Sequence, residues 1–315
     1  MSYKKPPLRN LLNVTTLCAA TLSVTATTAN STEPTLEDMT FDAGLVQDVG
    51  GSERINFSGK LRMLSQRVPA AACNLNAGVD PFHSSETLNA SATEFHNILE
   101  ALEFGDPTMG IIGAERSRKG LMAIKVVKDI WVPVEDASGK LLDDSHAEVA
   151  EQYVAHHNLE LLEAAKLLVS QLSGQYANPV ALLNSDAIRL DIAGRQRMLT
   201  QKVSKEACHI LSEINGEEAK KALPRTIQMF EISHQALRFG MPEAGIKAID
   251  DSEINAGLDL VASNWAALRP LLATIEAGGE LDLSTRAELA QSLNTTMKNM
   301  NDVVHLYSDA SKLGT

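Results

Sequence analysis

The feature that most constrains the fold of this chain is an internal repeat. Residues 55–68 align with residues 190–203 without a gap, and both segments contain Gly-x-x-Arg-Met, then one residue, then Ser or Thr and Gln. The same separation is kept by Cys73 and Cys208, Phe95 and Phe230, and Phe104-Gly105 and Phe239-Gly240. A repeat of this kind indicates two copies of one structural unit, so we predict two similar domains.

Both copies have the composition and patterning of helix. Ala, Leu, Glu and Met are abundant, while aromatic residues make up only 4% of the chain. Residues of the abundant kind lose little side-chain freedom in a helix. No segment alternates apolar and polar residues over the length of a strand, so no sheet is expected. Four amphipathic helices with short turns specify an up-down bundle. The predicted fold class is therefore all-α, with two tandem four-helix bundles.

Turn residues and periodicity place the helices of each copy. The second helices should end at Phe104-Gly105 and Phe239-Gly240, because Gly suits a left-handed C-cap and Pro follows soon after. The third helices should contain Trp131 and Trp265, and the fourth helices should have N-caps at Ser145 and Ser284. The first, third and fourth helices are expected at about residues 53–76, 113–131 and 144–172, and in the second copy at about 185–214, 247–275 and 284–312.

The N-terminus has the pattern of an export signal. Lys4, Lys5 and Arg9 precede a short apolar stretch and then small residues. The apolar stretch is shorter than the roughly 20 residues that span a bilayer. We expect a cleaved signal peptide and a periplasmic protein, with an uncleaved N-terminal anchor as the alternative. The predicted organisation is a signal peptide at 1–29, a loose acidic segment at 30–51, and bundles at 52–175 and 180–315, linked through Ser173–Pro179.

Charge and motif content exclude several classes of function. The formal net charge is -12, and nucleic acid is excluded as a partner because its phosphates would be repelled. The chain lacks the paired Glu-x-x-His motifs of di-iron bundles, and it has no nucleophile constellation with motif context. We therefore expect no enzyme activity, no cofactor and no metal. His156-His157, with Glu160 and Glu163, are interpreted as a solvated face, and His209 is isolated in the sequence.

The first helix of each copy has two ordered faces. One is apolar and should pack into its own bundle; its residues are Phe57, Leu61, Leu64, Val68 and Leu75. The other is polar and carries a glycine one turn before an arginine. Its residues are Ile55, Gly59, Arg62, Gln66 and Cys73 in the first copy, and Leu190, Gly194, Arg197, Gln201 and Cys208 in the second.

The polar face is suited to a small anion. Gly inside a helix costs about 1 kcal/mol relative to Ala, so its natural gain is the close approach of another backbone or of a ligand. Arg supplies a planar fork of donors that matches an oxyanion, and the glutamines one turn later can donate or accept. The alternative is that these arginines are solvated or paired with neighbouring Glu, as most helical arginines are.

This motif resembles a known family. The pattern Asn-x-x-Gly-x-x-Arg-Met-x-Ser/Thr-Gln-Arg/Lys at 56–67, with one departure at 191–202, is similar to the signature of the sensory domain of PilJ-type pilus chemotaxis transducers and to a segment of NarX-type nitrate/nitrite sensor kinases. The resemblance implies a four-helix bundle that senses outside the inner membrane. In the nitrate sensors the motif arginine binds the anion where two first helices meet in a dimer.

The resemblance assigns residues by position. The arginine corresponds to Arg62 and Arg197, and the motif glycine to Gly59 and Gly194. The motif asparagine is Asn56 in the first copy, but the second copy has Asp191. An acidic residue would repel an anion, so the second copy should bind more weakly or only support the first. Pilus-type members need not bind nitrate, so the family does not fix the ligand.

The duplication offers a further hypothesis. One chain supplies two equivalent first helices, so the copies could form an internal pseudo-dimer in which Arg62 and Arg197 approach one shared site. A homodimer that pairs like copies is the alternative. Cys73 and Cys208 lie on the same face, close to three turns beyond the arginines. We interpret them as small buried apolar residues, and a disulfide in an oxidising compartment is the alternative.

These observations predict an exported sensory or ligand-binding protein for a small oxyanion, with nitrate or nitrite as the first candidates. The predicted ligand-binding residues are Arg62, Arg197, Gly59, Gly194, Asn56, Gln66 and Gln201. The sequence has no kinase or methyl-accepting segment, so the chain should lack its own output domain. The alternative is an interaction module that docks on an envelope receptor, a transporter or a pilus or chemotaxis component.

Overall fold

The computed structural model describes residues 50–144, 147–176 and 184–313 of the 315-residue chain. Across these residues the structure is helical and contains no β-strand, which confirms the all-α prediction. The predicted signal peptide, most of the acidic segment, the N-cap at Ser145 and part of the predicted linker lie outside the described residues. None of the described helices is long and apolar enough to cross a membrane.

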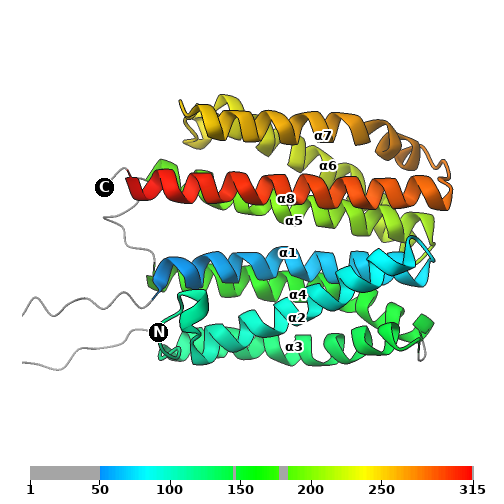
Figure 1. Ribbon diagram of the computed structural model, residues 1–315, viewed down its shortest axis with the longest axis horizontal. Coiled ribbons are helices and arrows are strands. Elements are labelled where there is room, and N and C mark those ends of the chain that lie inside the picture. Colours follow the sequence, from blue (N-terminus) through cyan, green and yellow to red (C-terminus); the bar gives the residue numbers. More distant parts are fainter. Residues whose placement is uncertain (1–49, 145–146, 177–183, 314–315) are drawn as a thin grey trace, which may run out of the picture. The chain divides into compact units, whose positions relative to one another are not determined.

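Each copy contributes four helices (Figure 1). The helices of the first copy are α1 (Gly51–Asn76), α2 (Pro81–Phe104), α3 (Arg118–Leu142) and α4 (Ala147–Tyr176). Those of the second copy are α5 (Asn184–Leu211), α6 (Gly216–Phe239), α7 (Ser252–Glu276) and α8 (Leu283–Leu313). In the first copy α1 packs on α2 and α4, and α3 packs on α4; α5, α6, α7 and α8 repeat this pattern. The prediction of two tandem helical bundles is therefore confirmed.

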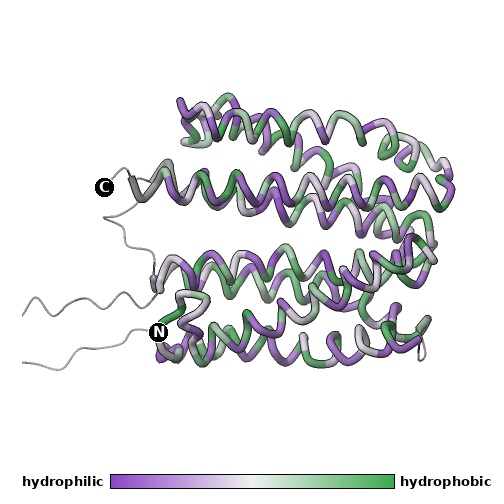
Figure 2. Tube along the Cα trace, viewed as in Figure 1, coloured by the Kyte–Doolittle hydropathy of each residue, from purple (hydrophilic) through white to green (hydrophobic). Residues whose placement is uncertain are grey.

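Each bundle has its own apolar core. Phe95 stacks on Trp131 with ring centroids 4.0 Å apart, and Phe230 stacks on Trp265 at 3.9 Å. The predicted apolar face of α1 lies in the first core: Leu61, Leu64 and Val68 are buried, while Phe57 and Leu75 are partly buried against it. The hydropathy of the helices alternates from turn to turn along their length, as expected when one side of each helix is buried (Figure 2).

Glycine ends the second helix of each copy, as predicted, but not in the left-handed helical conformation. Gly105 has φ 85° and ψ 149°, and Gly240 has φ 78° and ψ 165°. This extended region at positive φ is populated almost only by Gly. A Cβ at Gly105 would lie 2.6 Å from the Gly113 carbonyl oxygen, so the close passage of the following loop also requires glycine.

Several predicted helix boundaries were wrong. The third helices begin at Arg118 and Ser252, five residues after the predicted starts at about 113 and 247. Helix α3 does not end at Trp131 but continues to Leu142, with Pro133 inside it. One proline removes a single backbone hydrogen bond, and packing of the buried face of the helix tolerates that loss. Asp282, not Ser284, caps α8, because its carboxylate accepts from the backbone N–H of Thr285 at 2.8 Å. Helix α4 also extends to Tyr176, into the segment expected to be linker.

Candidate functional site at the contact of the two copies

Helices α1 and α5 pack directly against each other and join the two copies (Figure 1). Cys73 on α1 and Cys208 on α5 form a disulfide, with their Cα atoms 6.2 Å apart. Both cysteines are buried. The interpretation of these residues as unbonded was therefore wrong, and the alternative, a disulfide, is what the structure contains. The polar faces of the two first helices meet because this bond and the α1–α5 contact hold them together.

Arg62 and Arg197 extend into the same region of the α1–α5 contact. A Cβ built on Gly194 would lie 3.6 Å from Nη2 of Arg62 and 3.8 Å from Nη2 of Arg197, so the two guanidinium groups are neighbours. Both side chains are largely removed from solvent, with only 7% of Arg62 and 3% of Arg197 exposed. The structure thus brings the two motif arginines, which are far apart in sequence, to one place within a single chain.

The two arginines have different partners. Nη1 of Arg62 donates to a carboxylate oxygen of Asp191 on α5 at 3.0 Å, and Asp191 also pairs with Arg195 at 2.6 Å. Nη1 of Arg197 donates to the neutral side-chain oxygen of Asn301 on α8 at 2.7 Å. Asp191 was expected to act only by repelling an anion, but here it also holds Arg62 in place across the contact.

Asn56, the motif residue equivalent to Asp191, does not join this arrangement. Its side chain is exposed on α1, and no hydrogen bond joins that side chain to another described residue. Arg197 therefore has no counterpart of the Arg62–Asp191 ion pair. The two halves of the site are unequal, and the inequality arises from one residue of the motif.

The two guanidinium groups make this region electrostatically positive, although burial and mutual repulsion oppose their charges. Burial, and then the nearby charge of Arg62, lower the pKa of Arg197 to about 10. Burial also lowers the pKa of Arg62, and Asp191 partly offsets that effect. The Nε atoms of both arginines are buried and have no hydrogen-bond partner among the described residues. Two positive groups with free donors and one partly exposed carboxylate are an arrangement that an anion would satisfy.

The motif glycines leave room beside the guanidinium groups. Gly59 and Gly194 are both buried. A Cβ on Gly59 would meet only Nη2 of Arg62, at 3.6 Å, and one on Gly194 would meet only the two guanidinium ends. No backbone of another element comes within 4 Å of either Cβ position. Of the two explanations for these glycines, the close approach of another backbone is therefore not what the structure contains.

The two glutamines of the motif have other partners. Gln66 is buried and its Nε2 donates to the backbone oxygens of Ser65 at 3.0 Å and Asn158 at 3.2 Å. Gln201 donates to the side-chain oxygen of Asn294 on α8 at 3.2 Å. Each glutamine therefore links its first helix to the fourth helix of its own copy, and no hydrogen bond joins either one to the described arginines.

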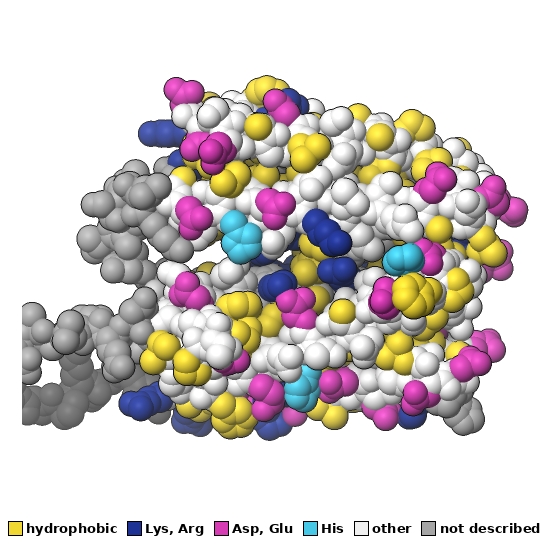
Figure 3. Space-filling model, in the orientation of Figure 1, with side chains coloured by type: hydrophobic (Ala, Val, Ile, Leu, Met, Phe, Trp, Pro, Cys, Tyr) yellow, Lys and Arg dark blue, Asp and Glu magenta, His cyan; other side chains and the backbone are white. Residues whose placement is uncertain are grey.

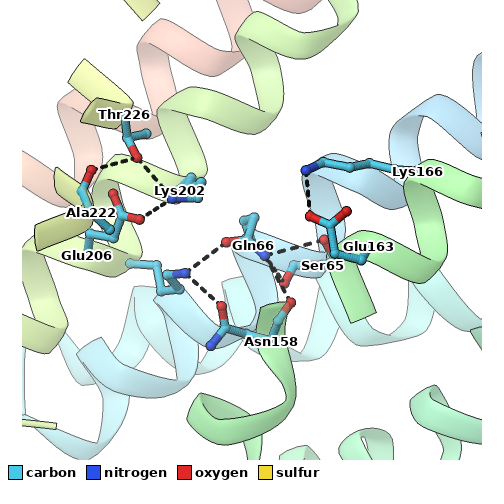
Figure 4. A network of polar contacts seen from close by, with 10 residues as sticks. Ser65, Gln66, Asn158, Glu163, Lys166, Lys202, Glu206, Ala222 and Thr226 are labelled. Atoms are coloured by element: carbon cyan, nitrogen blue, oxygen red, sulfur yellow. Dashed lines mark hydrogen bonds and ion pairs between the residues drawn. The ribbon is translucent and has the colours of Figure 1, made fainter. Parts of the chain in front are cut away.

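Lys205 is a buried residue at the contact of the two copies that the sequence analysis did not identify. Its Nζ donates to Oε1 of Gln66 at 3.0 Å and to Oδ1 of Asn158 at 2.7 Å, so it ties the second copy to the first. Figure 4 shows Gln66 and Asn158 side by side within this network. Burial lowers the pKa of Lys205 to about 7. The available signal was a departure between the repeats, since Ala70 is the equivalent residue of the first copy.

On the opposite side of the α1–α5 contact, the region equivalent to that around Lys205 contains a groove. The groove beside Ala70 is lined by Arg67 and Asn74 of the first copy and by Gln201 and Asn294 of the second, among others. Figure 3 shows Lys and Arg side chains gathered where the surface is hollowed between the two copies. One side of the contact is thus filled by a lysine, while a groove lies on the other.

The histidine pair set aside from the sequence does not gather a set of ligands. Nδ1 of His157 lies 3.0 Å from a carboxylate oxygen of Glu160 in an exposed pair, and Glu163 pairs with Lys166 at 2.7 Å. This arrangement agrees with the interpretation of a solvated face.

The fold and the repeated motif define a helical sensory domain, and the comparisons with known proteins give its family. Residues 45–155 and 180–296 both match the family described as "Type IV pili methyl-accepting chemotaxis transducer N-term", or PilJ. The chain belongs to the PilJ family and contains two tandem copies of its domain. The predicted resemblance to PilJ-type sensory domains is confirmed.

A curated relative is similar to part of the chain. The methyl-accepting chemotaxis protein McpN of Pseudomonas aeruginosa is 28% identical over 175 residues, which cover 54% of this chain. Those residues correspond to 32% of the relative, so the chain matches only about a third of that receptor's length. Family and relative together support a sensory or interaction module, the coarser form of the predicted function.

Proposed function

We propose that the chain is a periplasmic sensory protein that binds one small oxyanion at the α1–α5 contact, between Arg62 and Arg197. The observation that carries this proposal is the pair of buried guanidinium groups whose Nε donors lack partners. A planar oxyanion such as nitrate or nitrite accepts bidentate hydrogen bonds from guanidinium groups and would offset their repulsion. The two copies then act as an internal pseudo-dimer, with one binding site built from two halves.

The expected residue roles differ within the motif. Arg62 and Arg197 would contact the anion, and Gly59 and Gly194 would leave it room. Asp191 would orient Arg62 at some cost in anion affinity. Gln66, Gln201 and Asn56 remain predicted ligand-binding residues. In the geometry described above, the two glutamines would contribute to binding indirectly, by holding the first helices on α4 and α8.

Signalling would pass to another protein. The family model and the relative both come from chemotaxis transducers, so a membrane receptor or another chemotaxis component would provide the output. Export by the predicted signal peptide would place the chain where such a receptor has its sensory region. The family is a receptor family, and we assign the chain no enzyme activity.

Titration calorimetry with nitrate, nitrite and chloride tests the proposal directly. The full chain should bind nitrate or nitrite at one site per chain. Arg62→Ala and Arg197→Ala should each lower the affinity at least about tenfold, because each removes a charged hydrogen-bond donor worth roughly 1.5–3 kcal/mol. Lys220→Ala, which removes an exposed lysine paired with Glu217, is the control and should change nothing. A folded chain that binds none of these anions would overturn the choice of ligand.

Gly194→Ala separates anion binding from folding. The added methyl group would be in ordinary contact with the two guanidinium ends and with nothing closer. The variant should therefore fold with equal or higher stability, by up to about 1 kcal/mol, because Ala favours helix. It should nevertheless bind the anion more weakly, since the methyl group occupies space beside both arginines. Unchanged affinity would show that the anion does not approach this helix face.

A docking module is the second candidate function. Helix α3 exposes Met122, Val126 and Val132 on the outside of the first copy, and exposed apolar side chains of this kind occur at protein interfaces. A pull-down from an envelope extract with the wild type and Val126→Lys distinguishes the candidates. Under the docking hypothesis a receptor is captured by the wild type alone, without any need for anion.

A further inference from the structure

A second group of chemically active side chains lies beside the disulfide. Cys73 on α1, Glu151 on α4 and His209 on α5 each place a candidate ligand atom within 4.8 Å of the other two. All three are buried, with 1% of Glu151 and 2% of His209 exposed. Sulfur, imidazole nitrogen and carboxylate oxygen are the three ligand types that zinc takes in proteins. This group is separate from the two arginines and has no part in the proposed anion binding.

The carboxylate of Glu151 and Nε2 of His209 lack hydrogen-bond partners among the described residues. This holds for both carboxylate oxygens of Glu151. Nε2 of His209 lies 4.0 Å from Oε1 of Glu151, which is too far for a hydrogen bond. Burying a carboxylate without a partner is costly. A cation bound between these atoms would satisfy all of them at once.

The second copy shows that the group is not demanded by the fold. His209 is equivalent to Asn74, by the same register that pairs Cys208 with Cys73. The same separation of 135 residues makes Arg286 the equivalent of Glu151, and the buried residues of α4 and α8, such as Val154 and Leu289, keep this register. The opposite side of the disulfide therefore has an amide and a guanidinium group, and the guanidinium of Arg286 donates to Oγ of Ser212 at 2.6 Å. The same bundle geometry is built there without any unpartnered ionisable side chain.

We propose that Cys73, Glu151 and His209 form a Zn²⁺ site that becomes available when the Cys73–Cys208 disulfide is reduced. A dithiol reductant supplies two electrons and two protons: the S–S bond breaks to give two thiols, and the sulfurs of the reductant join as a disulfide. Zn²⁺ then replaces the thiol proton of Cys73, which passes to solvent. Zinc bonds of about 2.0–2.3 Å put tetrahedral ligands about 3.3–3.8 Å apart, so the three side chains need only small movements.

The cationic side chains near the proposed zinc site, Lys205 and Arg286, donate to residues outside it. Nζ of Lys205 is directed to Gln66 and Asn158, and not to Glu151. Arg286 donates to Oγ of Ser212 at 2.6 Å, and this oxygen lies 3.8 Å from the sulfur of Cys208 and 3.9 Å from the sulfur of Cys73. The cations thus have their own acceptors. Sγ of Cys208 does not lie within 4.8 Å of the ligand atoms of both Glu151 and His209, so Cys73 is the cysteine that the site uses.

Two single variants test the proposal without any reductant. Cys208→Ser leaves Cys73 as a free thiol beside Glu151 and His209, whereas Cys73→Ser leaves Cys208 as the free thiol. Each full-length protein is titrated with Zn²⁺ against a chromogenic chelator and with Co²⁺, whose thiolate charge-transfer band reports sulfur ligation. Cys208→Ser should bind one equivalent at least about 100-fold more tightly than Cys73→Ser. Equal affinities, or no binding by either protein, would overturn the proposal.

The second copy supplies a matched control for His209. In the Cys208→Ser background, His209→Asn installs the residue of the opposite side and Glu151→Ala removes the carboxylate, and each should lower zinc affinity at least about tenfold. Circular dichroism establishes that each protein is helical. If the single variants do not fold, wild-type protein reduced with a dithiol replaces them. The reduced form should take up one zinc per chain and the oxidised form none, and equal uptake by both forms would refute the site.

Discussion

The two copies share one fold, yet the second has buried ionisable residues at positions where the first has none. The first copy has Ala70, Asn74 and Leu99 at three positions where the second has Lys205, His209 and His234. All six side chains are buried. Packing of the bundles therefore needs no ionisable side chain at these positions. The fold does not require the ionisable groups of the second copy. We therefore expect their contacts to serve the function of the protein.

The two sides of the α1–α5 contact also differ from each other. Lys205 fills its side by bonding to Gln66 and Asn158, while the groove beside Ala70 stays open. Asp191 neutralises part of the arginine pair from the second copy, and Asn56 does not do so from the first. A symmetric pair of bundles has in this way become a contact with two unlike sides.

Removing the disulfide should have the largest effect on this pair of copies. The bond joins residues that are 135 positions apart, and closing a loop of that size contributes roughly 3–5 kcal/mol. Cys73→Ala with Cys208→Ala should lower the free energy of unfolding by about 4 kcal/mol and allow the second copy to unfold first. Trp131 and Trp265 report on one copy each, so urea unfolding followed in single-tryptophan variants measures both. One unchanged transition would mean that α1–α5 packing alone couples the copies.

Acid should destabilise the second copy through His234. Burial lowers the pKa of His234 to about 4, with nearby Arg238 contributing. The folded state then binds fewer protons than the unfolded state, so stability is full above pH 6.5 and falls as the pH drops from 6.5 to 4. The loss amounts to about 3 kcal/mol. His234→Leu, the residue of the first copy, should remove this part of the pH dependence in thermal unfolding. An identical pH profile for both proteins would contradict the assignment.

Exchanging the buried lysine should have a smaller effect that differs between the two sides. Lys205→Met leaves Oε1 of Gln66 and Oδ1 of Asn158 without their donor and should cost about 2 kcal/mol. Ala70→Met adds the same side chain beside the open groove and should change stability by less than about 1 kcal/mol. Urea unfolding of the two variants measures the difference. Equal losses would show that the two sides are packed alike.

The repeat made most of the fold predictable. Two copies, four helices in each and the burial of the first-helix apolar face all follow from periodicity and register. The errors arose where a local signal was overridden: Pro133 does not end α3, because the helix retains its buried face on both sides of the proline. Asp282 caps α8 although Ser284 is an equally good capping residue, and sequence does not choose between neighbours of this kind.

The candidate site was predictable only in part. The motif identified Arg62 and Arg197, but the ion pair of Arg62 with Asp191 depends on the distance between two helices that are remote in sequence. Glu151 could not be assigned to the same group as His209, because α4 and α5 come together only in the folded chain. Comparing the copies position by position points to Lys205 and His209, and such departures within a repeat are signals that need no alignment of homologues.

Joining α1 and α5 in one chain has a consequence for dose response. Where two separate subunits build a binding site, its occupancy depends on how much protein is present, because the subunits must first associate. Here the second half is supplied at a fixed effective concentration by the connecting chain and by the disulfide. The response of such a protein to its ligand would not change with its own expression level, even when only a few copies are present in a cell.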